Sequence, residues 1–151
     1  MKTNLVARAT LAAVGVALFI TVALPAQAEP CSLANVAGSF GYTTSGFVAT
    51  PTGVFVPAAA AGRIVFDRSG NVSGTQTRVV AGSSLEETYS GTYSVNPNCT
   101  GSFTVLVEPD TRTSTVDLVW TDNTNGVSAV FTTQGFVLTA TARRIQPKET
   151  K

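Results

Sequence analysis

The sequence predicts an all-β domain, an antiparallel meander of about eight strands that closes into an up-and-down barrel. Beyond residue 28, apolar and polar residues alternate with a period of two, which is typical of strands with one buried and one solvated face. No stretch there sustains the 3.6-residue period of a helix. Turn residues separate the runs at short intervals, so sequential strands should pair. A β-sandwich is the alternative. Long Greek-key crossovers between strands would favour it, and the sequence shows none.

Residues 1–28 have the pattern of a secretory signal peptide. Lys2 and Arg8 form a positive n-region, an almost uninterrupted apolar run follows, and residues 26–28 (AQA) form a small-x-small cleavage site. The run is too short to span a bilayer comfortably. We therefore expect a mature chain of residues 29–151 that forms one domain, is secreted or periplasmic, and has no membrane contact after cleavage.

Strands are expected where alternation is bounded by turn residues, at 39–48, 53–56, 61–67, 72–80, 84–95, 101–108, 114–121, 127–133 and 135–143. Asp67, Asp110 and Asp122 lie in the intervening turns, where their carboxylates are expected to bond local backbone. Asp117 alternates with apolar neighbours and should point outward.

The segment from Ala49 to Ala61 is the exception to this regularity. Pro51 and Pro57 flank a short apolar run, and four alanines follow. Proline confines such a segment to an edge, a bulge or a loop. We expect either a mobile flap over one mouth of the barrel or an irregular linker.

Charge predicts no electrostatic partner. The chain has ten Lys or Arg residues, of which Lys2 and Arg8 belong to the signal, and nine Asp or Glu, so the mature net charge is −1. The arginines are mostly scattered among acids, so no nucleic-acid partner is expected. The basic cluster of Arg143, Arg144 and Lys148 is expected to be a solvated C-terminal end.

The two cysteines, Cys31 and Cys99, both lie in the mature chain. Export places them in an oxidising compartment, where a disulfide persists. A structural bridge between them would tie the mature N-terminus to the turn around Pro97.

Histidine is absent, so a Ser-His-Asp or Cys-His arrangement and a histidine-bound metal site are excluded, and no metal or cofactor is expected. Glu87 is a weak catalytic candidate because it shares a face with Tyr89 and Tyr93, the face expected inside. It could act as a general acid or base. Its proximity to the turn at Gly82 favours a solvated position at the rim of the barrel.

Aromatic residues fall on the inward faces, and they would fill a core or line a cavity equally well. A mostly filled interior is the expectation. If a cavity exists, the candidate ligand-binding residues are Tyr42, Tyr89, Tyr93, Trp120 and Phe131.

Three stretches resemble secreted bacterial proteins of the allene oxide cyclase-like, or calycin-like, β-barrel group. They are residues 38–42 (GSFGY), 62–74 (GRIVFDRSGNVSG) and 91–101 (GTYSVNPNCTG). The resemblance implies an eight-stranded antiparallel barrel with a central cavity. Some members of that group cyclise or isomerise an apolar substrate, and many have no assigned activity. No catalytic motif of the cyclases matches here.

The sequence thus favours a secreted, non-catalytic barrel that could bind a small apolar ligand. The alternatives are a cyclase or isomerase acting on an apolar substrate, and a structural or surface-interaction protein with a filled core. A weak homo-oligomer is also expected, because four aliphatic residues interrupt the outward polar faces, with Val119 opposite Val130 across a hairpin. These residues are Leu106, Val119, Val130 and Val137.

Overall fold

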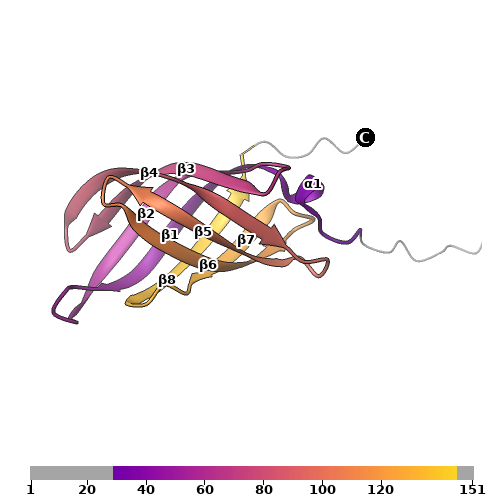
Figure 1. The fold of residues 1–151 in the computed structure, drawn as a ribbon. Coiled ribbons are helices and arrows are strands. Elements are labelled where there is room, and N and C mark those ends of the chain that lie inside the picture. Colours follow the sequence, from indigo (N-terminus) through magenta and orange to yellow (C-terminus); the bar gives the residue numbers. More distant parts are fainter. Residues whose placement is uncertain (1–28, 146–151) are drawn as a thin grey trace, which may run out of the picture.

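A computed structural model describes residues 29–145 as a closed barrel of eight antiparallel strands, preceded by one short helix (Figure 1). The expected signal peptide and Lys148 lie outside these residues. The elements are α1 (Leu33–Val36), β1 (Gly38–Ala49), β2 (Phe55–Phe66), β3 (Asn71–Val80), β4 (Ser83–Val95), β5 (Thr100–Glu108), β6 (Arg112–Thr121), β7 (Gly126–Phe131) and β8 (Phe136–Arg144).

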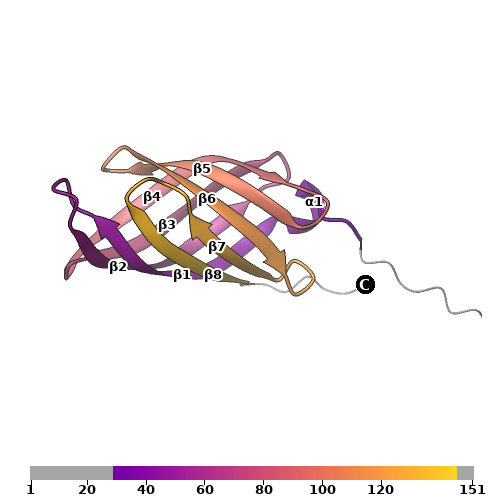
Figure 2. The ribbon, with the colours of Figure 1, turned by 90° about the horizontal axis from the view of Figure 1, so that it is seen from below.

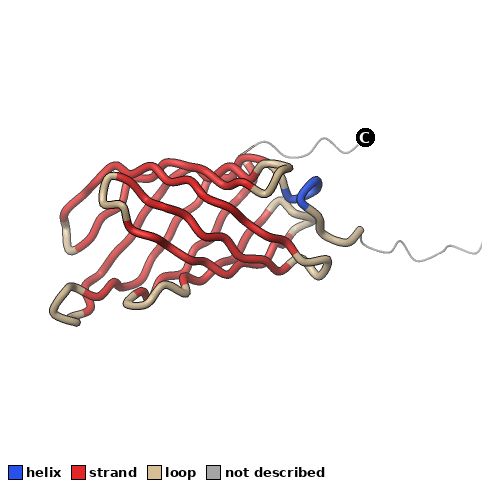
Figure 3. Tube along the Cα trace, in the orientation of Figure 1, coloured by secondary structure: helices blue, strands red, loops and turns tan. Residues whose placement is uncertain are grey.

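The topology is the predicted up-and-down meander. Each strand pairs with the next, and β8 pairs with β1 from Val48 opposite Phe136 to Phe40 opposite Arg144, which closes the sheet. Figures 2 and 3 show the tilted strands and the short loops that join them. Closure leaves no unpaired sheet edge, and the sandwich alternative is excluded.

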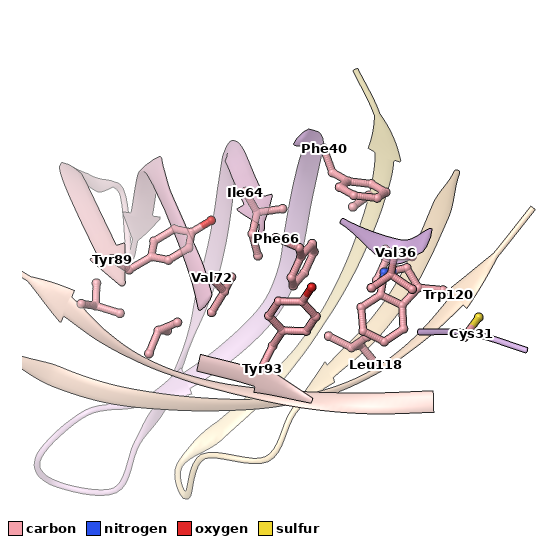
Figure 4. Packing of buried hydrophobic residues seen from close by; sticks show 14 residues of the cluster. Cys31, Val36, Phe40, Ile64, Phe66, Val72, Tyr89, Tyr93, Leu118 and Trp120 are labelled. Atoms are coloured by element: carbon pink, nitrogen blue, oxygen red, sulfur yellow. The ribbon is translucent and has the colours of Figure 1, made fainter. Parts of the chain in front are cut away.

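Inward side chains differ in size between the two halves of the barrel. In the half next to α1, aromatic rings fill the interior around Phe66, whose centroid lies 4.9 Å from that of Tyr93 and 5.7 Å from those of Phe40 and Trp120 (Figure 4). In the other half many inward positions are small. Because strand alternation fixes which residues point inward, the sequence itself makes one half solid and the other hollow.

The solid end is closed by the mature N-terminus. Cys31 and Cys99 form the predicted disulfide, the Cys31 amide donates to the Pro97 carbonyl, and Val36 of α1 is fully buried over the aromatic core. Thr124 of the β6–β7 loop donates its hydroxyl to the Asn35 carbonyl at 3.0 Å. The helix therefore acts as a plug attached to two loops.

Arg144 completes this closure, so the expectation of a wholly solvated basic tail is wrong for this residue. Its guanidinium lies 4.6 Å from the ring centroid of Phe40 and donates to the carbonyls of Ala37 and Thr124 at 2.8 and 3.0 Å. Burial lowers its pKa. The cation–π contact and the backbone carbonyls keep the guanidinium at the end of the barrel. The carbonyl at the C-terminal end of α1 has no partner within the helix and is therefore free to accept from it. Neighbouring Arg143 is exposed and pairs with Asp122.

The segment after Ala49 is neither a flap nor an irregular linker. Only residues 50–54 form a turn, and β2 runs without a break from Phe55, merging two of the expected strands. Pro57 fits because its carbonyl accepts from the Ala81 amide just past the end of β3. In an antiparallel sheet the N and C=O of one residue point toward the same neighbouring strand. The nitrogen of Pro57 therefore points toward the end of β3, where the ladder of hydrogen bonds has ended and no N–H is needed.

The β6–β7 hairpin has a different register from the expected one. Val119 lies opposite Ser128 and Val130 opposite Asp117, so Val119 and Val130 are diagonal rather than direct neighbours. The reason is the loop of residues 122–125, in which three consecutive residues adopt positive φ. This loop pairs Thr121 with Gly126, so the centre of the hairpin lies before Thr124 and the register differs from the expected one. Asp117 points outward, as predicted.

No helix within residues 29–145 is long and apolar enough to cross a membrane.

Candidate functional site

A cavity of about 550 Å³ occupies the half of the barrel that faces away from α1. It extends from Phe66 of the aromatic core to the loops at the opposite end, where Thr50, Pro51 and Asp110 line it. The expectation of a mostly filled interior is therefore wrong for this half. Small-molecule sites commonly have volumes of about 300–1,000 Å³, so the cavity has the size of a ligand site.

One wall of the cavity is apolar. β7 and β8 present Ala129, Phe131, Phe136, Leu138 and Ala140 to it. The alanines create the space, since larger inward side chains at these positions would meet across the barrel. Ala60 of β2 contributes another small position to the lining.

The facing wall, on β3 and β4, is polar. Four residues on neighbouring strands stand in one row, with Tyr42 opposite Gly62, Gly62 opposite Gln76 and Gln76 opposite Glu87. Gly62 is required here, because a Cβ atom at this position would lie 2.8 Å from the Cβ of Gln76. Across the gap that Gly62 leaves, the Tyr42 hydroxyl donates to Gln76 Oε1 at 2.7 Å, and Gln76 Nε2 donates to Glu87 Oε2 at 2.5 Å.

Two arginines complete the surroundings of Glu87. Arg78 Nε donates to Oε1 at 2.7 Å, and Arg112 Nη1 and Nη2 donate to Oε1 and Oε2 at 2.6 and 2.7 Å. With the bond from Gln76, each carboxylate oxygen accepts two hydrogen bonds. Burial acts to raise the pKa of Glu87, but the bonds from Arg112, Gln76 and Arg78 outweigh it, and the pKa is lowered.

The expectation of a solvated Glu87 is wrong. Its side chain is fully buried, whereas those of Arg78 and Arg112 are partly exposed, so the guanidinium groups separate the carboxylate from solvent. Nearness to the Gly82 turn misled the prediction, because Arg112 reaches Glu87 from β6, a strand that is distant in sequence. Glu87 is thus an ionised anchor for the two arginines.

Asp110 also has a different role from the expected one. Its Oδ2 accepts from Arg78 Nη2 and Arg112 Nη1, both at 3.1 Å, instead of bonding local backbone. Among the three turn aspartates, Asp67 behaves as predicted: its carboxylate accepts from the amides of Ser69 and Asn71. The Asp110 contact links the β5–β6 turn to the polar wall.

The two tyrosines of the cavity are neutral phenols. Burial raises the pKa of Tyr42 to about 12 and also raises that of Tyr89. Tyr89 stands opposite Gly74 and extends over it to donate its hydroxyl to the Arg63 carbonyl at 3.2 Å. A Cβ atom at position 74 would lie 2.4 Å from the Tyr89 ring, so Gly74 makes this placement possible.

The structure divides the five expected ligand-binding residues between the two halves. Tyr42, Tyr89 and Phe131 line the cavity. Tyr93 and Trp120 belong to the aromatic core, where their rings lie 6.2 Å apart. Sequence analysis missed Gln76, Arg78 and Arg112, although alternation with Val72 and Val80 marks the first two as inward. An arginine at an inward strand position was the available signal.

Within residues 29–145, no three His, Cys, Asp or Glu side chains lie close enough together to hold a metal ion. No protein-family model matches the chain, and no curated protein or solved structure matches it either.

Proposed function

We propose that this protein binds a small, mainly apolar molecule inside its barrel. The observation that carries the proposal is the 550 Å³ cavity, whose lining is apolar on one wall and bears a compact polar group on the other. Sites for small molecules combine these features, with apolar area providing affinity and a few polar groups fixing orientation.

A binding role is favoured over catalysis by the state of Glu87. Its two oxygens accept four hydrogen bonds from Gln76, Arg78 and Arg112, which leaves no free lone pair to take a proton from a substrate. Tyr42 and Tyr89 keep their protons because burial raises their pKa. Glu87, Tyr42 and Tyr89 thus favour a binding role, and these three residues give the cyclase alternative no acid–base pair.

We further propose that the protein is exported and belongs with the allene oxide cyclase-like barrels. The Cys31–Cys99 disulfide supports export, because such bonds persist in oxidising compartments. An eight-stranded closed barrel with a cavity agrees with the resemblance. N-terminal sequencing of the secreted protein should begin at Glu29.

The binding proposal is tested by native mass spectrometry of protein purified from its source, followed by titration with a neutral lipophilic dye, phenylnaphthylamine. A retained small molecule or saturable dye binding with one site per chain is expected. Ala60→Phe, which fills the cavity, should weaken dye binding about tenfold or more.

Ala61→Phe is the matched control, because Ala61 is the next residue of β2 and points outward. It should leave dye affinity unchanged. Absence of both a retained molecule and saturable dye binding in the wild-type protein would refute the proposal, as would equal effects of the two substitutions.

A further inference from the structure

The charged groups at the cavity cancel one another. Arg78, Asp110 and Arg112 line it, and Glu87 lies directly behind the two arginines. Two guanidinium groups and two carboxylates sum to zero, and each arginine bonds to both acids. The other residues of the lining carry no charge. The cavity therefore presents a polar wall without a net charge.

We propose that this charge balance makes the site selective for electrically neutral ligands, with an apolar body and a hydroxyl or N–H group, over carboxylates, sulfonates and amines. The inference rests on the proposed binding function and specifies its ligand class.

An anionic ligand is disfavoured because both guanidinium groups that could donate to it already pair with carboxylates. To pair with the guanidinium groups it would compete with Glu87, whose bonds measure 2.6 to 2.7 Å, and with Asp110 at 3.1 Å. Displacing Glu87 would leave a fully buried carboxylate without its partners, which is costly. An anion that leaves the pairs intact meets the negative charge of Asp110 beside the arginines.

A cationic ligand is disfavoured for the complementary reason. Both acids are paired, and the groups that line the cavity beside Asp110 are the guanidiniums of Arg78 and Arg112. An ammonium group entering an apolar lining would lose its hydration without gaining a free carboxylate.

Neutral hydrogen-bonding groups do have partners deeper in the cavity. The hydroxyls of Tyr42 and Tyr89 donate to protein oxygens and also interact with each other, and a phenol oxygen with two lone pairs can accept a further bond. Thr44 and Ser114 add two hydroxyls to the lining that can donate or accept. A ligand hydroxyl or N–H can bind to these groups without disturbing an ion pair.

The experiment compares two dyes with one skeleton, neutral phenylnaphthylamine and its sulfonate, anilinonaphthalenesulfonate. The wild-type protein should bind the neutral dye about tenfold or more tightly than the sulfonate. Ala60→Phe should weaken binding of whichever dye gives a signal, which assigns that signal to the cavity.

Asp110→Asn tests the charge balance itself. Asp110 is exposed in a turn, so the variant should fold, and the cavity wall gains a net positive charge. The affinity ratio of neutral dye to sulfonate should then fall about fivefold at low ionic strength. Asp117→Asn makes the same change of net charge on the outer face of the barrel and should leave the ratio unchanged.

Three outcomes are decisive. Sulfonate binding to the wild-type cavity as tight as that of the neutral dye overturns this inference and leaves the binding function intact. Equal effects of Asp110→Asn and Asp117→Asn on the ratio overturn it as well. Failure of both dyes to bind the wild-type protein, together with the absence of a retained small molecule, refutes the binding function itself.

Discussion

Glu87 shows how one residue organises the polar wall from three strands. Gln76 and Arg78 reach it from β3, and Arg112 reaches it from β6 past the end of β5. Gln76 and Arg78 come from the hairpin partner of β4, whereas Arg112 comes from two strands along the meander, so pairing of β3 to β6 brings the group together. The contribution of this group to stability can be measured.

Glu87→Gln should lower the free energy of unfolding by about 3 kcal/mol, because two partly buried guanidiniums lose a shared counter-charge. Urea denaturation gives the value. Glu86→Gln is the matched control, since Glu86 points outward and accepts from the Thr77 hydroxyl at the surface. A loss as large in the control would show that the buried network has no special weight.

The lowered pKa of Glu87 also predicts how stability depends on pH. Hydrogen bonds favour the charged form in the folded state, so the folded pKa lies below the unfolded value of roughly 4.3. The stabilisation is fully present above that value and is lost as pH falls through the folded pKa. The unfolding free energy should drop below about pH 4, and less steeply in Glu87→Gln. Parallel curves for the two proteins would contradict this assignment.

Trp120 belongs to the packed half of the barrel and Phe131 to the hollow half, so substitutions at these two residues compare the stability of the halves. Trp120→Ala should cost about 3–5 kcal/mol of unfolding free energy, because the buried indole packs against Phe66 and Tyr93. Phe131→Ala should cost clearly less, because that ring lines the cavity and is only half-buried. Trp120 is the single tryptophan, so acrylamide quenching of native fluorescence checks its burial independently.

Among the elements, α1 depends most on covalent attachment. It has four residues, too few to be stable alone, and it is held by the Cys31–Cys99 bridge and by side chains from the β6–β7 loop and β8. A disulfide that closes a long loop stabilises mainly by restricting the unfolded chain.

Replacing both Cys31 and Cys99 by alanine should therefore lower the free energy of unfolding by up to about 4 kcal/mol. Hydrogen exchange should quicken around Val36 more than in β3. Thiol titration of the unreduced, unfolded wild-type protein should find no free thiol. Two free thiols would remove the basis of this prediction.

Much of the element order was readable in the sequence, because alternation and turn residues are local signals. The inward faces of β5 to β8 and the disulfide are confirmed. The errors come from non-local contacts. Pro57 belongs to a strand because β3 ends beside it, and the β6–β7 register depends on a loop attached to α1. The candidate site was only half predictable, since Arg112 reaches Glu87 past the end of β5, a contact between strands that are not neighbours in the sheet.

At the scale of the whole molecule, one face of the barrel carries no charge. Residues 30–62 and 123–142 contain no Asp, Glu, Lys or Arg, and they build β1, β7 and most of β2 and β8, which are adjacent around the barrel. Val137 is 61% exposed on this face and pairs directly with Phe47, which is 50% exposed. Val130 lies diagonal to Val137, whereas Leu106 lies apart on β5.

Self-association through this face stays a prediction. The apolar stripe that would carry it consists of Val119, Val130, Val137 and Phe47, with Phe47 in place of Leu106. Sedimentation should show concentration-dependent association of the wild-type protein that a Val130→Lys, Val137→Lys double variant abolishes. Leu106→Lys, equally exposed but outside the stripe, is the control. A wild-type protein that stays monomeric at high micromolar concentration would rule the surface out.

The division of the barrel into a packed half and a hollow half has a consequence for evolution. The same eight strands serve both halves, and residues such as Phe66 and Tyr89 belong to the core and also line the cavity, whereas Ala60 and Ala140 line the cavity alone. Substitutions at Ala60 or Ala140 reshape the lining at positions that lie outside the cluster of rings around Phe66. Ligand preference should therefore change through such positions more readily than the architecture of the barrel does.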